Sequence, residues 1–528
     1  MKKILSVVLV FSLLLSMTAL FASAKEEPCR ADIVFAESAA DIAALEKDVP
    51  MIFVPGFGET IYRGLDTEDE SDDISVFGPD MSILLPSLFK HIPGFLFGVL
   101  TKNFDLVDKH LGPFVLEVFS DVGCNPDGTI KEGTGAKPDN EAEPTDEFGY
   151  RSSYTFSFDW RKDMHTLAGE LNDYIEEIKS VTDSDKVALV AFSQGNCVVM
   201  TYLYEYYYSV EKPEDRAGIE AVVFMCGAMN GVGACEDPVS GNISIDSLSL
   251  LRYLKTCFEG MPALMGLYYM VEMLYSVGIM DWLVDTVNEY LESRLDSAVD
   301  PYLINTFGAL PGFYAMMSPE VYAEAEQFMF GTTERQEKYA GMLEKNRYYH
   351  NEVQANNENI IDMLMADGKN VAIIAEWGYP IAPATRDNDR MTDFSICTSQ
   401  ESFGATCSEV DGILGYNYVQ AKECECGNDH VSCDLQIDAS TCAYPDITWF
   451  GKNLKHDAGS RFWGDLVDLI VYSDEQINVW TYSDYPQFSV NYEDRFLVPL
   501  TNDGSYAVPF EETLIFGKNR AGVGAFGC

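Results

Sequence analysis

The feature that most constrains this chain is the segment of residues 185–206, which reads DKVALVAFSQGNCVVMTYLYEY. Residues 186–192 form a short run of apolar and β-branched side chains, which predicts a buried strand. The letters SQG then predict an abrupt turn at residues 193–195, and the helical spacing of the apolar residues that follow predicts a helix over residues 196–206. The chain must therefore adopt a fold in which a buried strand passes directly into a helix.

The turn places a serine, Ser193, in the pattern A-x-S-x-G that is typical of a nucleophile elbow. Small residues are needed on both sides because the serine backbone in such a turn is strained and its neighbours pack closely. The helix N-terminus behind the serine directs amide hydrogens toward any oxyanion formed there. We interpret Ser193 as a candidate nucleophile; the alternative is the glycine-containing βα turn of any doubly wound protein.

Further strands and helices alternate around this segment. Apolar runs predict strands at residues 49–54, 154–158, 219–225 and 370–375, and an amphipathic helix is predicted at 167–178. The alternation predicts an α/β fold with a mostly parallel sheet flanked by helices and right-handed crossovers. Between residues 228 and 368 the strand rhythm stops, which predicts a helical cap insertion rich in Met and aromatic side chains.

The predicted organisation begins with a signal peptide (1–24) and a first part of the core (25–227), which contains a loop or lid insertion (61–150). The helical cap (228–368) follows, and then a second part of the core (369–475) with a cysteine-rich loop (397–442). A C-terminal β-like extension (476–528), with a strand-like run around 477–480, ends the chain.

The N-terminus predicts export. Lys2 and Lys3 precede an apolar stretch and then the small residues Ala22-Ser23-Ala24, as in a secretory signal peptide. We therefore expect a secreted or extracytoplasmic protein. A membrane anchor would need a longer apolar span.

The charge balance excludes some partners. The net charge of −49 comes from 84 acidic and 35 basic residues. It argues against nucleic-acid binding and against electrostatic attachment to anionic membranes. The acidic run at residues 66–73 predicts a solvated loop, with a structural Ca²⁺ site as the alternative. We expect no cofactor and no obligate protein partner.

Thirteen cysteines in an exported chain predict disulfides. Six of them lie in the cysteine-rich loop: Cys397, Cys407, Cys424, Cys426, Cys433 and Cys442. A zinc site is the rival interpretation, but the absence of a C-x-x-C pair there favours a loop held by disulfides. Cys197 and Cys226 fall on predicted core elements and are interpreted as buried thiols.

A nucleophilic serine needs a general base, and the base needs a carboxylate to orient it. In the order serine, acid, histidine, His456 is the expected base because it directly precedes the last predicted helix. His430, in the cysteine-rich loop, is the second choice, and His350 is interpreted as a residue of the cap or the surface.

The expected acid is Asp411, in the turn-like sequence EVDGIL, with Asp389 and Asp393 as rivals. A glycine loop follows the first predicted strand and predicts one side of an oxyanion hole. The expected donors are the amides of Phe57 and Gln194.

Taken together, the motifs of the chain and their order resemble the lecithin:cholesterol acyltransferase-like branch of α/β-hydrolases, which includes phospholipases and bacterial lipases. The motifs are V-P-G-F-G at residues 54–58, D-W-R at 159–161, A-F-S-Q-G at 191–195 and D-G-I at 411–413, followed by His456. The resemblance implies an α/β-hydrolase fold and a serine acylhydrolase that cleaves lipid esters through a Ser-His-Asp triad and an acyl-enzyme, and the signal peptide predicts that the enzyme is secreted. The expected partner is a lipid or other ester substrate, with transient contact with a lipid interface. The alternatives are an acyltransferase of the same type and a non-catalytic secreted binding protein on a hydrolase scaffold.

Overall fold

The structure is a computed structural model that describes residues 45, 47–65, 73–77, 81–145, 153–259, 261–424, 426–456, 460–492 and 496–500. The predicted signal peptide (1–24), nearly all of the acidic run and the last part of the C-terminal extension lie outside the described residues.

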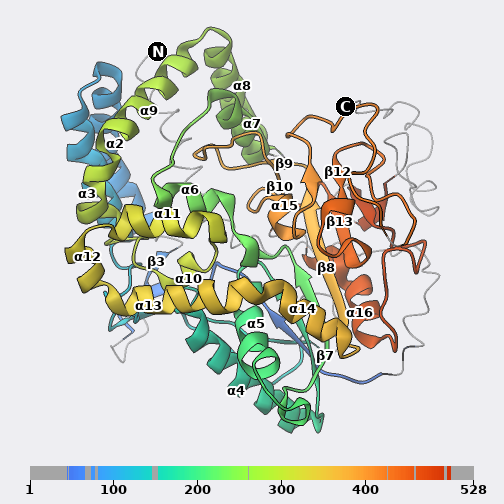
Figure 1. Cartoon of the computed structure of the whole chain (residues 1–528). Helices are drawn as coiled ribbons and strands as arrows, with labels where there is room; N and C mark the ends of the chain where they lie inside the picture. Colours follow the sequence, from blue (N-terminus) through green and yellow to red (C-terminus); the bar gives the residue numbers. More distant parts are fainter. Residues whose placement is uncertain are drawn as a thin grey trace.

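A central eight-stranded sheet organises the molecule (Figure 1). Its order is β15-β14-β13-β8-β7-β6-β1-β5, and every neighbouring pair is parallel except the edge pair β14 and β15. The strands are β1 (Met51–Val54), β5 (Ser153–Thr155), β6 (Val187–Phe192), β7 (Ile219–Met225), β8 (Asn370–Trp377), β13 (Thr448–Lys452), β14 (Phe488–Tyr492) and β15 (Phe496–Pro499).

The central strands are buried on both faces, as parallel sheets require. All residues of β1, β6 and β8 are buried, which explains why their sequences are continuous apolar runs rather than alternating ones. The chain runs from β1 outward to β5 and then returns to β6 on the other side of β1. This reversal creates a switch point where loops diverge at the carboxyl ends of β1 and β6, the usual place for a ligand site in an open α/β sheet.

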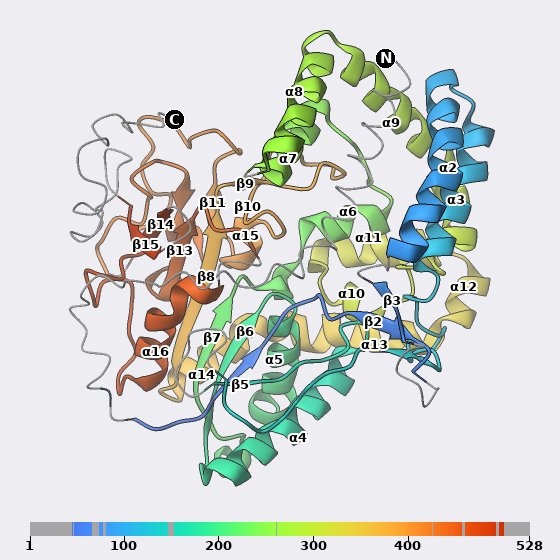
Figure 2. The same ribbon diagram turned by 180° about the vertical axis from the view of Figure 1, so that it is seen from behind.

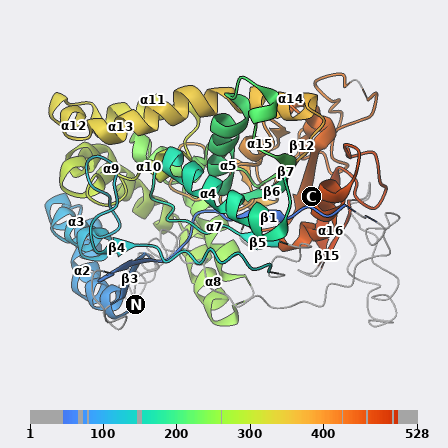
Figure 3. The same cartoon turned by 90° about the horizontal axis from the view of Figure 1, so that it is seen from below.

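Helices cover both faces of this sheet (Figure 3). On one face lie α4 (Met164–Thr182), α5 (Gly195–Leu203) and α14 (Asn357–Ala366), and on the other lies α16 (Gly464–Tyr472). The side chain of Asp163 caps α4 by accepting the Thr166 N–H at 3.0 Å, and Asp183 ends the helix with φ of +54°. These caps supply partners for backbone groups that the ends of the helix leave unsatisfied.

The segment between β7 and α14 is helical, as predicted for the cap. It contains α6 (Gly233–Ser240), α7 (Ser247–Phe258), α8 (Pro262–Ser276), α9 (Ile279–Ala298), α10 (Pro311–Tyr314), α11 (Pro319–Phe330), α12 (Thr333–Lys338) and α13 (Ala340–Tyr348). Figure 2 shows α7, α8 and α9 above the end of the sheet where the short strands β9 (Tyr379–Pro380) and β10 (Met391–Thr392) lie.

A second helical unit, α2 (Met81–Thr101) and α3 (Phe104–Phe119), lies beside the cap (Figure 2). It falls within residues 61–150, where a loop or lid was predicted. The rest of that insertion includes a small antiparallel sheet of β2 (Ile61–Arg63), β3 (Ile74–Phe77) and β4 (Thr134–Gly135). Tyr290 of α9 donates a hydrogen bond to Asp108 of α3 at 2.8 Å, so the unit of α2 and α3 is joined to the cap.

Among the described residues one helix segment, Ile83–Thr101 in α2, is long and apolar enough to cross a membrane by length and composition alone. In the structure this helix packs along α3, and Ser87 donates to Glu117 at 2.8 Å. Contact with α3 accounts for part of its apolar surface, and a third of the span is buried.

The predicted α/β fold with a mostly parallel, helix-flanked sheet and a helical insertion is confirmed. One local prediction is wrong: residues 477–480 form no strand, because the chain turns there through a Trp480 N–H to Asn478 side-chain hydrogen bond of 3.0 Å. The strands of the C-terminal extension are β14 and β15, further along the chain.

Candidate active site

Ser193 lies in the turn between β6 and α5 with φ of +53°, a left-handed conformation that is strained for a residue with a side chain. Hydrogen bonds hold it there. The Ser193 N–H donates to the Met225 carbonyl at 3.1 Å, and the Ser193 carbonyl accepts the N–H groups of Asn196 and Ala228, both at 3.1 Å. The structure therefore has the geometry predicted for an elbow.

Two glycines make room for this turn. A Cβ on Gly195 would lie 2.2 Å from the Val54 carbonyl oxygen, and a Cβ on Gly56 would lie 2.4 Å from the Cβ of Ser193. Neither distance is compatible with a side chain. The loop after β1 and the start of α5 can thus approach each other only because both positions are glycine.

His456 is the histidine that reaches the serine. Its Nε2 lies 2.8 Å from Ser193 Oγ, and its Nδ1 is hydrogen-bonded to a carboxylate oxygen of Asp393. Because the Asp393 carboxylate accepts, Nδ1 carries the proton and Nε2 offers its lone pair to the serine hydroxyl. The backbone N–H of His456 also donates to the Asp393 carbonyl at 2.9 Å, which fixes the histidine loop against the acid.

Asp393 is fully buried, and its second carboxylate oxygen accepts the N–H groups of Ser395 at 2.8 Å and Ile396 at 2.6 Å. Burial pushes the pKa of Asp393 upward, but the charge and hydrogen bond of His456, with further hydrogen bonds from Glu401 and Ile396, outweigh it and hold the pKa below its usual value. The carboxylate is therefore ionised at neutral pH.

The prediction that Asp411 is the acid is wrong in the structure. Asp411 lies in an exposed turn with φ of +62°, and it pairs with Arg252 Nε of the cap at 3.1 Å. The rival Asp389 is also on the surface and pairs with the same arginine, at 2.7 Å. The hairpin of β9 (Tyr379–Pro380) and β10 (Met391–Thr392) instead returns Asp393 to His456.

A second buried carboxyl group, missed in the sequence, lies behind Asp393. Glu401 ends the short helix α15 (Thr398–Glu401), is fully buried and accepts the N–H of Glu376 at 2.7 Å. Burial, and then the charge of Asp393, raise the pKa of Glu401 well above its usual value. Burial and the neighbouring Asp393 charge therefore both favour the neutral form of Glu401. No motif surrounds Glu401, so nothing in the sequence marks it.

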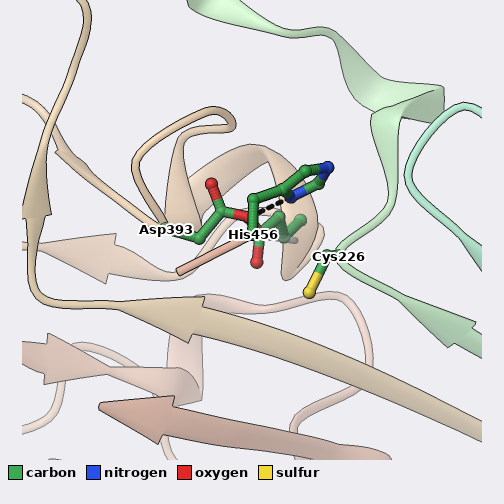
Figure 4. A group of neighbouring side chains, drawn as sticks. Cys226, Asp393 and His456 are labelled. Atoms are coloured by element: carbon green, nitrogen blue, oxygen red, sulfur yellow. Dashed lines mark hydrogen bonds and ion pairs between the residues drawn. The ribbon is translucent and has the colours of Figure 1, made fainter. Parts of the chain in front are cut away.

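Cys226 completes this buried group (Figure 4). One ligand-type atom each from Cys226, Asp393, Glu401 and His456 lie within 4.8 Å of one another. Burial, the largest cause, raises the pKa of the Cys226 thiol well above its usual value. Asp393 is already hydrogen-bonded to His456, and burial favours the neutral forms of the thiol and of Glu401, so this donor set fits a buried polar cluster better than a metal site.

The predicted oxyanion-hole residues border the serine on two sides. Gln194 directly precedes α5, and its side chain is anchored by donating to the carbonyls of Trp160 at 3.0 Å and Gly312 at 2.7 Å. Phe57 follows Gly56 in the loop that touches Ser193, and its ring packs on Trp160 with centroids 4.2 Å apart. Both backbone segments are thus held in place beside the hydroxyl.

The D-W-R motif at residues 159–161 holds the loop that carries Phe57 in place. Trp160 donates its indole N–H to the Glu59 carbonyl at 3.0 Å, while Arg161 and Asp159 form a buried two-point ion pair at 2.9 and 2.7 Å. Arg161 also donates to the Val122 carbonyl at 3.2 Å. The motif is therefore structural at this site: it fixes the loop that carries Phe57.

The other candidate histidines do not reach Ser193. His350 is buried in the cap, where its ring nitrogens bond to the Gln354 side chain at 2.6 Å and the Tyr314 carbonyl at 3.0 Å, and burial lowers its pKa to about 4. His430 is buried in the cysteine-rich loop beside Cys426. Neither has a hydrogen bond to the serine.

The cap touches the loops that carry the acid and the histidine. Tyr253 of α7 stacks on Phe394 with ring centroids 4.6 Å apart, and Lys455 donates to the Thr256 carbonyl of α7 at 3.2 Å. Ser193 itself is only 6% exposed. Only a small part of the serine therefore faces solvent, next to loops that contact α7.

A parallel sheet with this switch point, an elbow serine after β6, and a Ser193–His456–Asp393 hydrogen-bond chain at the carboxyl ends of the strands define the α/β-hydrolase fold. No protein-family model matches the chain, and no curated protein matches it in sequence. Among solved structures, a match was found to Kex1Δp, a prohormone-processing carboxypeptidase from Saccharomyces cerevisiae, at 12% identity and a TM-score of 0.18.

This match covers 62% of the chain and 65% of the carboxypeptidase, less than two thirds of the length of that enzyme. A likeness of this size carries no argument about activity. The fold assignment rests on the topology of the sheet and on the position of Ser193 within it.

Proposed function

We propose that this protein is a serine acylhydrolase that cleaves carboxylic esters of lipids. The observation that carries the proposal is the unbroken chain of hydrogen bonds from Asp393 through His456 to the hydroxyl of Ser193. A serine hydroxyl is a weak nucleophile by itself, and an adjacent base that is oriented by a carboxylate is the arrangement that activates it.

The proposed reaction has two steps. Ser193 Oγ attacks the ester carbonyl while His456 Nε2 takes its proton, and the amides of Phe57 and Gln194 stabilise the tetrahedral oxyanion. His456 then gives the proton to the departing alcohol, which leaves an acyl group on Ser193. Water, deprotonated by the same imidazole, releases the acid, and Asp393 keeps the imidazole in the required tautomer throughout.

The surface of the helical regions supports a lipid substrate. Large apolar side chains are exposed on α2, such as Phe89 at 79%, and on α8, such as Tyr269 at 60% and Met273 at 56%. Large exposed apolar side chains offer surface for contact with a lipid interface, which is the ground for proposing a lipid ester. These helices belong to the units that lie beside and above the end of the sheet where the serine is found (Figure 2).

A fluorophosphonate probe tests the proposal directly. We expect the purified protein to be labelled on Ser193 and to hydrolyse p-nitrophenyl esters, triglyceride or phospholipid, and we expect Ser193→Ala to lose both properties. Ser276→Ala, which changes an exposed serine of α8, is the matched control. Labelling of Ser193→Ala equal to that of the wild-type protein would refute the proposed nucleophile.

Two further points of the proposal have their own tests. Transfer of the acyl group to an alcohol, as in the acyltransferases of the resembled branch, would give a new ester when a long-chain alcohol is added, whereas hydrolysis gives only the free acid. Export, proposed from residues 1–24, predicts that the mature chain begins near Lys25. A folded protein that neither reacts with the probe nor cleaves any ester would instead favour a binding protein.

A further inference from the structure

A second histidine centre lies in the cysteine-rich loop, apart from the serine. It consists of Cys426 and His430 in the loop between β11 (Thr406–Cys407) and β12 (Ile437–Asp438), and of Asp446 in the turn that leads into β13. His430 Nε2 lies 3.1 Å from Cys426 Sγ and 3.6 Å from Asp446 Oδ1. One ligand-type atom from each of the three residues lies within 4.8 Å of the others.

These separations suit the coordination shell of one metal ion. A tetrahedral Zn²⁺ with bonds of about 2.3 Å to sulfur and 2.0–2.2 Å to nitrogen and oxygen places neighbouring ligand atoms roughly 3.3–3.6 Å apart. The observed 3.1 and 3.6 Å need only small adjustments to reach those values. The loop therefore need not refold to bring the three ligand atoms to one ion.

The hydrogen bonds around His430 fix which ring nitrogen faces this centre. Gln487 donates its side-chain N–H groups to the carbonyls of Pro445 at 2.7 Å and Thr448 at 3.2 Å, so its oxygen is the atom directed at the ring. His430 Nδ1 lies 2.9 Å from that oxygen and must donate to it. Nδ1 therefore carries the proton, and Nε2 presents its lone pair toward Cys426 and Asp446.

This arrangement is the one that metal-binding histidines show. A ligand histidine typically donates its other ring N–H to a hydrogen-bond acceptor, which sets the tautomer and the ring orientation. His430 is fully buried, whereas Asp446 and Cys426 are partly exposed. An ion thus has a route from solvent and a fixed nitrogen ligand at the inner end.

The neighbourhood offers a further ligand. Cys424 lies two residues before Cys426 in the same loop and carries a second thiol. Thiolate, imidazole and carboxylate together favour Zn²⁺ over Ca²⁺ or Mg²⁺, which prefer oxygen ligands only. Cys424 and Cys426 are both free thiols in the structure.

We propose that Cys426, His430 and Asp446 bind one Zn²⁺ ion, with Cys424 or water in the fourth position. The ion ties the cysteine-rich loop to the turn before β13 and, through Gln487, to the start of β14. This proposal does not depend on the esterase activity, because none of its residues contacts the Ser193 centre. Its expected role is to stabilise the loop that spans from β11 to β12.

The test uses the full-length protein, dialysed against ZnCl₂ and then against metal-free buffer, with bound zinc measured by mass spectrometry. We expect one zinc per chain in the wild-type protein and less than a tenth of that in Cys426→Ser and His430→Gln. Cys433→Ser removes a thiol from the same loop without touching the centre and is the matched control. It should retain one zinc per chain.

Two readouts separate loss of the ion from misfolding of a variant. Zn²⁺ should raise the unfolding temperature of the wild-type protein, and of Cys433→Ser, but not that of the folded His430→Gln. Gln487→Leu keeps all three ligands and removes only the hydrogen bond to Nδ1, so its zinc affinity should fall by about 10- to 100-fold.

Trp480 provides a local spectroscopic probe. Its ring lies 5.2 Å from that of His430, and its indole N–H donates to Asp446 Oδ1 at 3.3 Å. Zinc should therefore change the fluorescence of the wild-type protein by an amount that is absent in Trp480→Phe. Zinc content unchanged in both Cys426→Ser and His430→Gln, no zinc bound by the wild-type protein, or Cys426 recovered in a disulfide by peptide mapping would each overturn the proposal.

Discussion

The two sides of the candidate active site are held by different means. On the serine side, backbone hydrogen bonds and the lack of a side chain at Gly56 and Gly195 hold Ser193 between β6 and α5. On the acid side, Asp393 lies in a loop whose position depends on buried carboxyl groups and on side chains of the cap. The serine side is therefore determined mainly by backbone contacts at the ends of adjoining strands, and the acid side mainly by buried side chains and contacts with the cap.

The largest expected effect on activity comes from replacing Asp393, the acid bound to His456, compared with replacing the exposed Asp411. Asp393→Asn removes the carboxylate that orients His456 and should lower kcat by roughly 10⁴-fold, as the loss of the acid does in a serine triad. Asp411→Asn alters only an exposed ion pair with Arg252 and should leave kcat within a few-fold of the wild-type value. Ester hydrolysis by the two variants, measured side by side, checks this. The reverse order of activities would contradict the assignment.

On the serine side, Gly56→Ala should combine loss of activity with loss of stability. The new Cβ would lie 2.4 Å from the Cβ of Ser193, and relief of such overpacking typically costs about 1–3 kcal/mol of unfolding free energy. Denaturant unfolding and probe labelling together measure both effects.

Gly169→Ala is the control for that substitution. Gly169 lies inside α4 with no atom within 4 Å of the added Cβ, so alanine there should stabilise the protein by about 0.5–1 kcal/mol. Equal changes in unfolding free energy and in probe labelling for Gly56→Ala and Gly169→Ala would show that the close contact with Ser193 does not limit the side chain at position 56.

The buried acids should make opposite contributions to stability as pH changes. The raised pKa of Glu401 means that its contribution is complete below about pH 4.5 and is lost as pH rises through its folded-state pKa. The lowered pKa of Asp393 means that its contribution is present above about pH 4 and is lost as pH falls through its folded-state pKa. Glu401→Gln should therefore gain stability relative to the wild-type protein as pH rises.

The slope of that relative gain should not exceed about 1.4 kcal/mol per pH unit, the limit for one proton. Denaturant unfolding at a series of pH values measures it. Asp393→Asn should show the opposite trend, gaining relative stability as the pH falls. A difference between Glu401→Gln and the wild-type protein that stays constant with pH would contradict a protonated Glu401.

The smallest expected effect concerns the cap. Arg252→Lys keeps the charge but loses the two-sided contact with Asp389 and Asp411, and exposed pairs of this kind contribute about 0–1 kcal/mol. We expect a change in unfolding free energy within that range and an unchanged probe reaction. A large loss of labelling would show that the acid side depends on this arginine more strongly than its exposure implies.

The same contrast explains what could be predicted from the sequence. The elbow was predictable because strand, turn and helix follow one another within residues 185–206, and His456 because its place before α16 follows from chain order. The acid was not. Asp411-Gly412 is a strong local turn signal, but the partner of His456 is decided by how β9 and β10 fold back, which no local pattern records.

The cysteines also show that local sequence patterns do not reveal which distant residues meet in the fold. Their number in a chain with an N-terminal export signal predicted disulfides, yet no disulfide joins two of the cysteines that the structure describes. Spacing alone could not show that His430, Cys426 and Asp446 meet, because Asp446 is brought to the loop by the turn before β13. Glu401 was missed for a similar reason, since only burial against Asp393 distinguishes it from other glutamates.

One contact set links the cap to the reacting groups. Helix α7 carries Arg252, which pairs with Asp389 and Asp411 on either side of the acid, and Tyr253, which stacks on the residue next to Asp393. Lifting α7 would break all three contacts in the segment that aligns the imidazole. Any movement of α7 is therefore transmitted to the loop that carries Asp393, and through Asp393 to the orientation of the His456 ring.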